Sequence, residues 1–302
     1  EIPRFLSSPT NLQRMLRLAV STNAETFERI REPLADRGIE IGHLQAKERS
    51  IHLTGRESAG QFDVGFVFPG RLMEGTAINA LDELPWVNSR EDVLTSRNKG
   101  GVIATLDSVD IPVPESVMVS NPVDESVVSQ AVAELSFPVV IKPNSATRGV
   151  GVAKAADLDS LLGIVDYLNL IHDYRATGDK SYLIQEYLPA ARDYRVMVVD
   201  GDCVGGVERR LPEELADGRW KHNVHRGAEA TGLELPPEHR QLAEQVAAEL
   251  GISYLGVDLL ETDSRLVVNE TNARPTVDSA TKYDDDFYDR LAGVIKRTAT
   301  NS

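Results

Sequence analysis

The first third of the chain combines strand-like and helix-like spacing of its apolar residues. Apolar residues cluster in three strand-like segments, at 16–20, 39–45 and 61–68. Between the first two lies TFERIREPLADRG, which has helical spacing and ends at Gly38. A strand, a helix and further strands in this order predict an open, largely parallel sheet over about residues 15–95.

The pattern changes near residue 96, where a second unit is predicted. A helix is expected from about 90 to 106, and the Pro-flanked strand IPVP at 111–114 indicates a link into this unit. In the following segments, helix-like and strand-like spacing of the apolar residues alternate. Helices are predicted at 126–135 and 157–171, and strands at 137–143, 150–155 and 182–189.

The last third is predicted to contain hairpins. Strands at 193–199 and 203–210 are joined by VDGD, an Asp-Gly turn signal. The remaining segments are a helix at 238–251, apolar strands at 256–261 and 267–275, and a helix at about 284–298. The chain is thus expected to have an N-terminal extension and three α/β or α+β units, at 1–14, 15–95, 96–188 and 189–302.

Charge narrows the classes of partner. The 302 residues carry 47 acidic and 32 basic side chains, for a net charge of −15. Such a surface repels nucleic acids and anionic membranes, so neither is expected as a partner. No stretch of about 20 apolar residues could span a bilayer. The N-terminal residues do not resemble a secretory signal, so a cytoplasmic location is expected.

The acidic surface also suggests adaptation to high salt. Only eight of the basic residues are lysine. Salt screens the repulsion between like charges on such a surface. We therefore expect the melting temperature to rise between low-salt buffer and molar KCl. A melting temperature that stays constant over that range would contradict the hypothesis.

The sequence gives little support for a site built on cysteine or histidine side chains. Cys203 is the only cysteine, which excludes a disulfide within this sequence and a thiolate metal cluster. It lies in a turn-rich segment, where a bystander is a simpler interpretation than a nucleophile. The six histidines show no spacing typical of zinc ligands.

Three oxygen-bearing side chains lie on the two strands near the end of the chain. Glu270 and Asn272 are two residues apart and therefore share one face of their strand. Asp258 lies on the strand before the turn. Carboxylate and amide oxygens are the ligands that Mg²⁺ prefers. The hairpin is a candidate metal site, although an ordinary hairpin with solvated polar residues fits the same letters.

Two segments suggest phosphate binding. Lys142 ends an apolar strand, where a lysine is costly without an anionic partner. The glycine-containing loop that follows would let backbone amides approach a polyphosphate; its residues include Thr147, Gly149 and Gly151. A plain turn is the alternative, and no P-loop or dinucleotide-binding motif is present.

The strand that stops at Pro189 offers a candidate nucleobase site. The segment QEYL, residues 185–188, could present backbone groups to an adenine edge, and Asp193 could hold ribose hydroxyls. A core strand leading into a turn is the alternative interpretation.

The ordered set resembles the ATP-grasp superfamily, and most closely its RimK-like carboxylate–amine (alpha-L-glutamate) ligases. The resemblance covers roughly residues 15–300 and rests on the order of the elements. The matching runs are SIHLTGR (50–56), NKGG (98–101), GVGV, the strand lysine with its glycine loop, QEYL, VERR (207–210), NVHRGA (223–228) and GVDLL. It implies an ATP-grasp fold with an N-terminal parallel-sheet domain, a central lid and a C-terminal subdomain.

The resemblance also implies roles for residues. Lys99 and Lys142 would contact ATP phosphates beneath the glycine loop, and Asp193 would hold ribose. Adenine would be framed by Gln185, Glu186, Tyr187 and Leu188. One or two Mg²⁺ or Mn²⁺ ions would be bound by Asp258, Glu270 and Asn272. Phosphate and the reacting carboxylate would be contacted by Lys221 and Asn223, and substrate carboxylate or acylphosphate by Arg195 and Arg210.

Cationic residues concentrate in the same segments. Their convergence in one cleft would focus the field of an acidic protein on anionic substrates; they are Arg195, Arg209, Arg210, Lys221, Arg226 and Arg274. For Arg209 a surface ion pair is an equal alternative, because neighbours on a strand face opposite ways.

The motif departs from RimK-like ligases at Ala273-Arg274-Pro275-Thr276, where they have a small residue, Pro and Gly; the arginine there resembles carboxylase-type members. This departure leaves open whether glutamate is the amino acid.

The predicted activity is ATP-dependent ligation of an amino acid, such as glutamate, to a carboxylate acceptor through an acylphosphate. The acceptor would be a small molecule or a protein tail, and a homo-oligomer is possible. An ATP-grasp kinase acting on a hydroxyl is the main alternative, and a nucleotide-binding module without turnover is a third.

Overall fold

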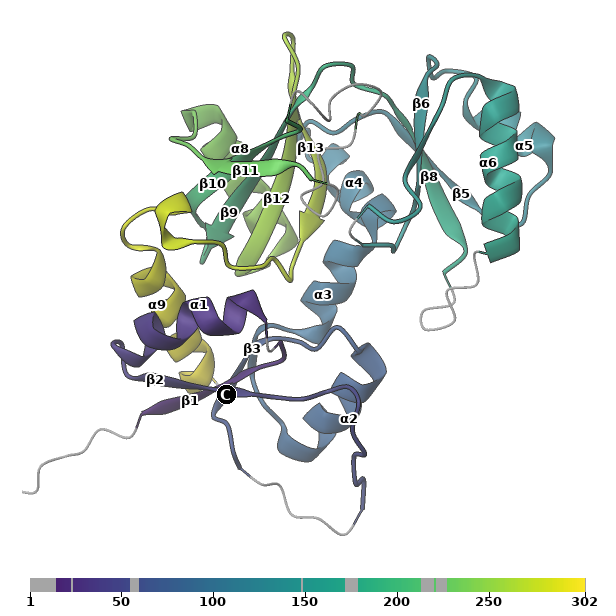
Figure 1. Cartoon of the computed structure of the whole chain (residues 1–302). Coiled ribbons are helices and arrows are strands. Elements are labelled where there is room, and N and C mark those ends of the chain that lie inside the picture. Colours follow the sequence, from purple (N-terminus) through teal and green to yellow (C-terminus); the bar gives the residue numbers. More distant parts are fainter. Residues whose placement is uncertain are drawn as a thin grey trace, which may run out of the picture.

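A computed structural model describes residues 15–22, 24–54, 60–147, 149–171, 179–212, 220 and 227–301. The chain folds into three sheets with helices around them (Figure 1). Among the described residues, no helix is long and apolar enough to cross a membrane. The predicted N-terminal extension, residues 1–14, lies outside the described residues.

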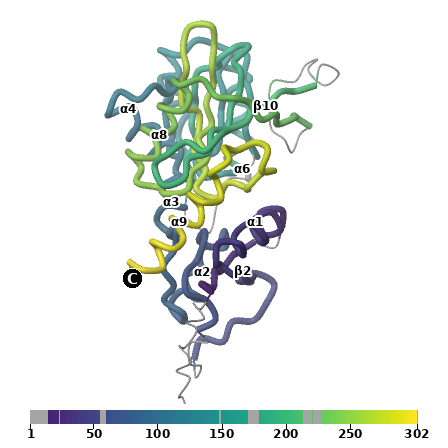
Figure 2. The backbone as a smooth tube through the Cα atoms, turned by 90° about the vertical axis from the view of Figure 1, so that its left-hand side faces the viewer, coloured from purple at the N-terminus to yellow at the C-terminus, as the bar shows by residue number. Residues whose placement is uncertain are grey.

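The first sheet is fully parallel, as the sequence predicted. Its strand order is β2-β1-β3-β4. The strands are β1 (Leu16–Val20), β2 (Ile39–His43), β3 (Val64–Val67) and β4 (Trp86–Asn88). Helices α1 (Glu25–Ala35) and α2 (Leu72–Asp82) connect them. Sequence reasoning did not identify α2 and β4. The final helix, α9 (Phe287–Thr300), returns to pack against this sheet and α1 (Figures 1 and 2).

The helix predicted over 90–106 is two helices, α3 (Arg90–Arg97) and α4 (Lys99–Asp107). The break occurs at Asn98, whose backbone leaves the helical region and whose side-chain Oδ1 accepts from the Gly101 amide at 3.1 Å. An asparagine that caps a new helix in this way ends the preceding one. The break places Lys99 in the first turn of α4, at the edge of the site described below.

The second sheet is antiparallel, with strand order β5-β8-β6-β7. Its strands are β5 (Ser116–Ser120), β6 (Val139–Pro143), β7 (Ala153–Ala155) and β8 (Ser181–Glu186). Helices α5 (Glu125–Ala131) and α6 (Leu158–Ile171) lie on one side of this sheet (Figure 1). Its apolar side chains form their own core, separate from the larger core of the molecule. The sheet and its two helices therefore form a unit that is packed independently.

The third sheet is also antiparallel, with strand order β11-β10-β9-β12-β13. Its strands are β9 (Arg192–Val199), β10 (Asp202–Arg210), β11 (Glu229–Gly232), β12 (Tyr254–Glu261) and β13 (Leu266–Asn272). Helix α8 (Pro237–Leu250) packs against β9, β10 and β12, and a short 3-10 helix, η2 (Ala280–Lys282), follows β13. The large core joins this sheet to the N-terminal sheet and includes residues of α4. The predicted unit boundaries near 95 and 188 stay a prediction.

Two β-bulges determine which side chains share a face of the third sheet. In β13, Asp258 faces Glu270 but Leu259 faces Val268, so Asn269 is the extra residue. In β10, Cys203 faces Val198 but Gly205 faces Met197, so Val204 is the extra residue. An extra residue inverts the alternation of side chains beyond it. Both bulges therefore decide which residues face the candidate site.

Candidate active site

The candidate metal ligands lie together at the β12–β13 hairpin. Asp258 is directly opposite Glu270 in the register, and Asn272 is two residues beyond Glu270 on the same face. Their common face depends on the bulge at Asn269, because regular pairing would instead bring Asn269 opposite Asp258. The hairpin thus presents two carboxylates and one amide oxygen.

Asp258 is buried and bound by two arginines. Its Oδ1 accepts from Arg195 Nε at 2.7 Å and its Oδ2 from Arg195 Nη2 at 2.8 Å. Arg209 Nη2 lies 3.0 Å from Asp258 Oδ2 and also pairs with Asp193. Burial alone would raise the pKa of Asp258, but the two guanidinium groups outweigh it and hold that pKa below its usual value. The carboxylate is therefore ionised at neutral pH.

Two buried lysines approach Glu270 from different elements. Lys99 Nζ lies 3.9 Å from Glu270 Oε2 and donates to the carbonyl of Ala146 at 2.6 Å. Lys142, at the end of β6, is near the bulge residue: its Nζ lies 3.3 Å from Asn269 Oδ1 and 3.4 Å from Asn269 O. The two lysines predicted to contact phosphate therefore converge on the β12–β13 hairpin, which carries the candidate metal ligands.

Burial lowers the pKa of Lys142 from its ordinary 10.5 to about 8, although Glu270 acts in the opposite direction. Below pH 8 the ammonium group is charged and available to an anion, and above pH 8 it loses its proton. Nucleotide affinity should therefore fall as pH rises from 7 to 9.5. Equilibrium titration with ATP and Mg²⁺ would measure this. Lys142→Arg, which stays charged, should remove the pH dependence; an unchanged profile in that variant would contradict the assignment.

The glycine loop lies between the two lysines. Gly149 and Gly151 have φ of 65° and 76°, values that side chains disfavour. A Cβ at Gly151 would also lie 2.7 Å from Pro143 Cγ. Thr147 and Gly149 line the cavity beside Lys99, and Gly149 also lines the cavity beside Lys142. The loop therefore covers the place where the two cavities meet.

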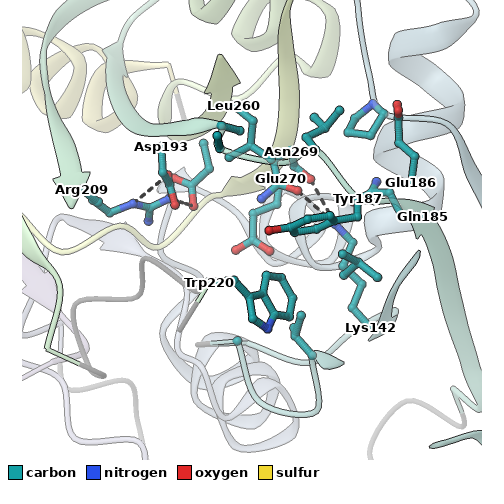
Figure 3. A pocket seen from close by; sticks show the side chains of 18 residues that line it. Lys142, Gln185, Glu186, Tyr187, Asp193, Arg209, Trp220, Leu260, Asn269 and Glu270 are labelled. Carbon is teal, nitrogen blue, oxygen red and sulfur yellow. Dashed lines mark hydrogen bonds and ion pairs between the residues drawn. The ribbon is translucent and has the colours of Figure 1, made fainter. Parts of the chain in front are cut away.

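The first cavity, about 340 Å³, opens between the second and third sheets (Figure 3). It contains every residue predicted for adenine and ribose. These are Gln185, Glu186, Tyr187, Leu188 and Asp193. The apolar part of its lining comes from Pro114, Val140, Val152, Ala190, Ala191 and Leu260. A cleft of this size that combines an apolar part with several charged side chains suits an organic ligand that has both an apolar and a polar part.

The polar groups of the predicted adenine segment are fixed by neighbours. Gln185 Nε2 donates to Ser116 Oγ at 2.8 Å, and Glu186 Oε1 accepts from the Glu115 amide at 2.8 Å. Glu186 also pairs with Arg265, from the β12–β13 turn. The first two contacts hold the end of β8 to the start of β5 in its own sheet, and the pair with Arg265 joins it to the third sheet.

An aromatic pair completes this cavity: sequence reasoning named Tyr187 but missed its partner Trp220. Tyr187 and Trp220 meet edge to face, with ring centroids 5.8 Å apart. Lys154 Nζ lies 4.5 Å from the centroid of Tyr187 and 5.6 Å from that of Trp220. Trp220 directly precedes Lys221 and the run NVHRGA, so its neighbourhood in sequence was a signal for it.

The second cavity, about 300 Å³, lies on the other side of the hairpin carboxylates. It shares Gly149, Arg209, Asp258 and Glu270 with the first. Residues that line the second cavity but not the first include Lys99, Thr147, Arg195, Asn272, Arg97 and Arg274. The candidate metal ligands thus stand between a partly apolar cavity and a strongly polar one.

Arg209, rather than Arg210, faces the site. Arg210 is 67% exposed in its side chain, pairs with Glu208 on the opposite face, and lines neither cavity. Regular pairing after the VDGD turn would have placed Arg210 on the face of Arg195. The bulge at Val204 inverts the alternation and brings Arg209 there instead. The predicted residues Lys221 and Asn223, and also Arg226, lie outside the described residues.

The residues present fit a divalent cation and a polyphosphate. Among the described residues there is no group of three or more His, Cys, Asp or Glu that could hold a metal. The hairpin donors are all oxygens, because they belong to two carboxylates and one amide. Such a set suits Mg²⁺ or Mn²⁺ better than zinc. Asn272 Oδ1 accepts from the Arg274 amide at 2.9 Å and retains a second lone pair. Lys99 and Lys142 supply positive charge beside it.

Curated proteins similar in sequence to this chain are named as ligases. A "Probable alpha-L-glutamate ligase" of Citrobacter koseri is 28% identical over 83% of this chain and 82% of its own length. A "Ribosomal protein bS6--L-glutamate ligase" of Escherichia coli is 27% identical over 90% of this chain and 92% of its own.

The fold is that of ATP-grasp enzymes. The solved structure of a RimK domain ATP-grasp protein from Sphaerobacter thermophilus superposes with a TM-score of 0.67, at 23% identity, over 93% of this chain and 98% of the other. The family model for the RimK-like ATP-grasp domain matches residues 96–289. The chain belongs to the RimK-like ATP-grasp family.

Proposed function

We propose that this protein is an ATP-dependent carboxylate–amine ligase that joins an amino acid to a carboxylate acceptor. The observation that carries the proposal is the position of the Asp258, Glu270 and Asn272 oxygens between two cavities, with Lys99 and Lys142 beside them. One cavity suits a nucleotide and the other an anionic substrate. The phosphates of the nucleotide would lie where the cavities meet.

The proposed reaction has two steps. A carboxylate oxygen attacks the γ-phosphorus of ATP, the bond to ADP breaks, and an acylphosphate forms. An amine nitrogen then attacks the acyl carbon, phosphate leaves, and the nitrogen loses a proton to solvent or phosphate. No covalent enzyme intermediate is needed, because positioning and charge neutralisation are sufficient.

The side chains of the site would act by charge and position. A bound Mg²⁺ or Mn²⁺ would neutralise charge on the phosphates, and Asp258, Glu270 and Asn272 would hold it. Lys99 and Lys142 would bind the phosphates from two sides. Arg195 would orient Asp258, to which it is bound through both oxygens.

Nucleotide recognition would use the first cavity. Gln185 to Leu188 would frame the base against Tyr187 and Trp220, and Asp193 would hold the ribose. The second sheet, within the proposed lid unit 96–188, would close over the nucleotide through the glycine loop. Lys221 and Asn223, on the segment around Trp220, stay proposed contacts to phosphate and substrate.

The names of the relatives favour glutamate as the amino acid and, in one case, a protein tail as the acceptor. Arg274 replaces a small residue of the RimK-like motif, so the acceptor of this chain need not be the same. A cytoplasmic location and a homo-oligomeric state stay predictions.

A product screen tests the proposal. Purified protein with ATP and Mg²⁺ would be offered amino acids crossed with candidate carboxylic acids, while ADP and free phosphate are measured. Equal amounts of both products, released only when an amine and a carboxylate are present, would support the ligase. ADP formed with a phosphorylated alcohol and without free phosphate would instead identify a kinase, an activity that the ligase relatives do not favour.

A further inference from the structure

The second cavity concentrates positive charge in an acidic protein. Of the described residues that line it, two are carboxylates, Asp258 and Glu270, and five are cationic: Arg97, Lys99, Arg195, Arg209 and Arg274. The first cavity has the opposite balance, with two cations and four carboxylates. In a protein with a net charge of −15, the second cavity is where an anionic substrate would be attracted.

The five cations fall into two groups. Arg195 and Arg209 bind Asp258, and Lys99 lies near Glu270, so these three belong to the metal hairpin. Arg97 and Arg274 lie at the other end, where the third sheet meets the N-terminal unit. Arg97 Nη2 donates to the carbonyl of Gly70 at 3.3 Å, and Arg274 Nη2 to Ser21 Oγ at 3.4 Å.

The guanidinium groups of Arg97 and Arg274 meet at Gly70. A Cβ built on Gly70 would lie only 2.0 Å from Arg274 Nη1, so the absence of a side chain makes room for this arginine. The same glycine accepts the hydrogen bond from Arg97 through its carbonyl. Two planar guanidinium groups at one point suit a carboxylate, which each can bind through two oxygens.

Arg274 also links the site to a third cavity, of about 320 Å³. This cavity lies at the carboxyl ends of β1 and β3 and shares Arg274 and Thr276 with the second. Its further lining is mostly neutral and includes Ser21, Thr22 and Phe66. The carboxyl edge of a parallel sheet is a common place for ligands. A substrate longer than one carboxylate could extend from the hairpin past Arg274 into this space.

We propose that Arg97 and Arg274 bind a second, non-reacting carboxylate of the substrate, and that the ligase therefore acts on acidic substrates with at least two carboxylates. This inference rests on the proposed function and names its specificity-determining residues. The carboxylate that reacts lies at the metal hairpin, and the second lies at the Gly70 end of the same cavity. The second carboxylate belongs either to an acidic amino acid or to the acceptor.

Binding measurements on the whole protein test the proposal. The protein is first saturated with AMP-PNP and Mg²⁺, and calorimetry then compares glutarate with butyrate and glutamate with glutamine. In at least one pair, the dicarboxylate should bind at least about tenfold more tightly, because charged hydrogen bonds to a second carboxylate have that effect. Preference for glutamate alone would assign the second carboxylate to the amino acid, and preference for glutarate alone would assign it to the acceptor.

Three variants should reduce that preference to about twofold or less: Arg274→Gln, Arg97→Gln and Gly70→Ala. The last removes no charge; its new methyl group displaces the Arg274 side chain, a flexible group, and so leaves the fold intact. Matched controls are Arg31→Gln, an exposed arginine on α1, and Gly163→Ala, where a Cβ meets nothing within 4 Å. Both controls should keep the wild-type preference.

The outcomes separate this inference from the proposed function. If AMP-PNP with Mg²⁺ does not bind, the proposed function fails first. If it binds but the dicarboxylates show no advantage in the wild type, or if the three variants retain the advantage, the second carboxylate site is wrong and the ligase proposal stands.

Discussion

Replacing Glu270 with glutamine should lower turnover by at least about a hundredfold, an effect typical of losing one charged group that stabilises a transferred phosphoryl group. Glutamine has the same shape but no negative charge for the divalent cation. Glu270 is also the acidic group nearest to Lys99 and lies between the two cavities. ADP release at saturating ATP, Mg²⁺ and substrates would measure the loss.

The fold of this variant should persist, since Glu270 is not part of either large apolar core and its side chain is partly exposed. An unchanged circular dichroism spectrum and a similar melting temperature would verify that. Glu229→Gln, at an exposed position on β11, is the matched control and should keep full turnover. Full turnover in the Glu270 variant would contradict the proposal that Glu270 binds the divalent cation.

Replacing Asp258 with asparagine should destabilise the protein by about 3 kcal/mol or more, the usual cost of removing one partner from a buried ion pair. The asparagine NH2 group cannot accept a hydrogen bond, so Arg195 would lose one of its two bonds and its anionic partner, and Arg209 would lose one of its two acidic partners. Urea unfolding at pH 7 would measure the change in the free energy of unfolding. Turnover should be lost as well, because the proposed metal ligand would lose its negative charge.

The same pair of proteins gives a pH test with a defined sign. The pKa of Asp258 is held below its ordinary 3.8 in the folded state, so its ionised form stabilises the fold above pH 3.8. That contribution is lost only as pH falls through the lower folded value. The difference in stability between wild type and variant should be constant from pH 8 to 5 and should narrow below about pH 4.

A surface ion pair is the control for this experiment. Asp289 pairs with Arg37 at 2.7 Å, but its side chain is 67% exposed. Asp289→Asn should therefore change stability little, since solvent screens such pairs. An equally small change for Asp258→Asn would mean that the buried network does not support the third sheet.

Much of this site was predictable because its chemistry follows strand periodicity. The pairing of Glu270 with Asn272 follows from a spacing of two, and the position of Lys142 follows from an apolar strand that ends in proline. The parallel N-terminal sheet follows from the order of its strands and first helix. Each of these inferences uses neighbours in sequence, where local geometry decides the outcome.

What sequence reasoning missed depends on contacts between distant segments. The choice of Arg209 over Arg210 is made by one bulged residue, and nothing in the letters CVGGVERR marks where that residue lies. Arg97 and Arg274 meet at Gly70 only because the N-terminal unit packs against the third sheet. The break at Asn98 depends on its side chain turning back to Gly101. The pattern of apolar and polar residues along the chain cannot predict such contacts.

The second sheet contributes to the site in a different way. It has its own core and touches the metal hairpin through Lys142 and Asn269, and the β12–β13 turn through Glu186 and Arg265. A unit with a separate core can rotate as a rigid body when a ligand joins it to its neighbour. The pair of Glu186 with Arg265 is a contact between the two units that such a rotation would move.

The extra residue in β13 has a consequence for how this enzyme tolerates change in length. Substituting Asn269 leaves the count of residues intact, so Glu270 and Asn272 keep their side of the strand. Deleting it would remove the bulge and pair Glu270 with Asp258 directly after the Val268–Leu259 pair, so Glu270 and Asn272 would keep their face. Keeping the residue but losing the bulge would instead place Asn269 opposite Asp258 and turn Glu270 away. Natural sequences should therefore vary in the length of this hairpin only at the turn between residues 262 and 265 or by the absence of this one residue, because both forms of the strand carry Glu270 and Asn272 on the face of Asp258.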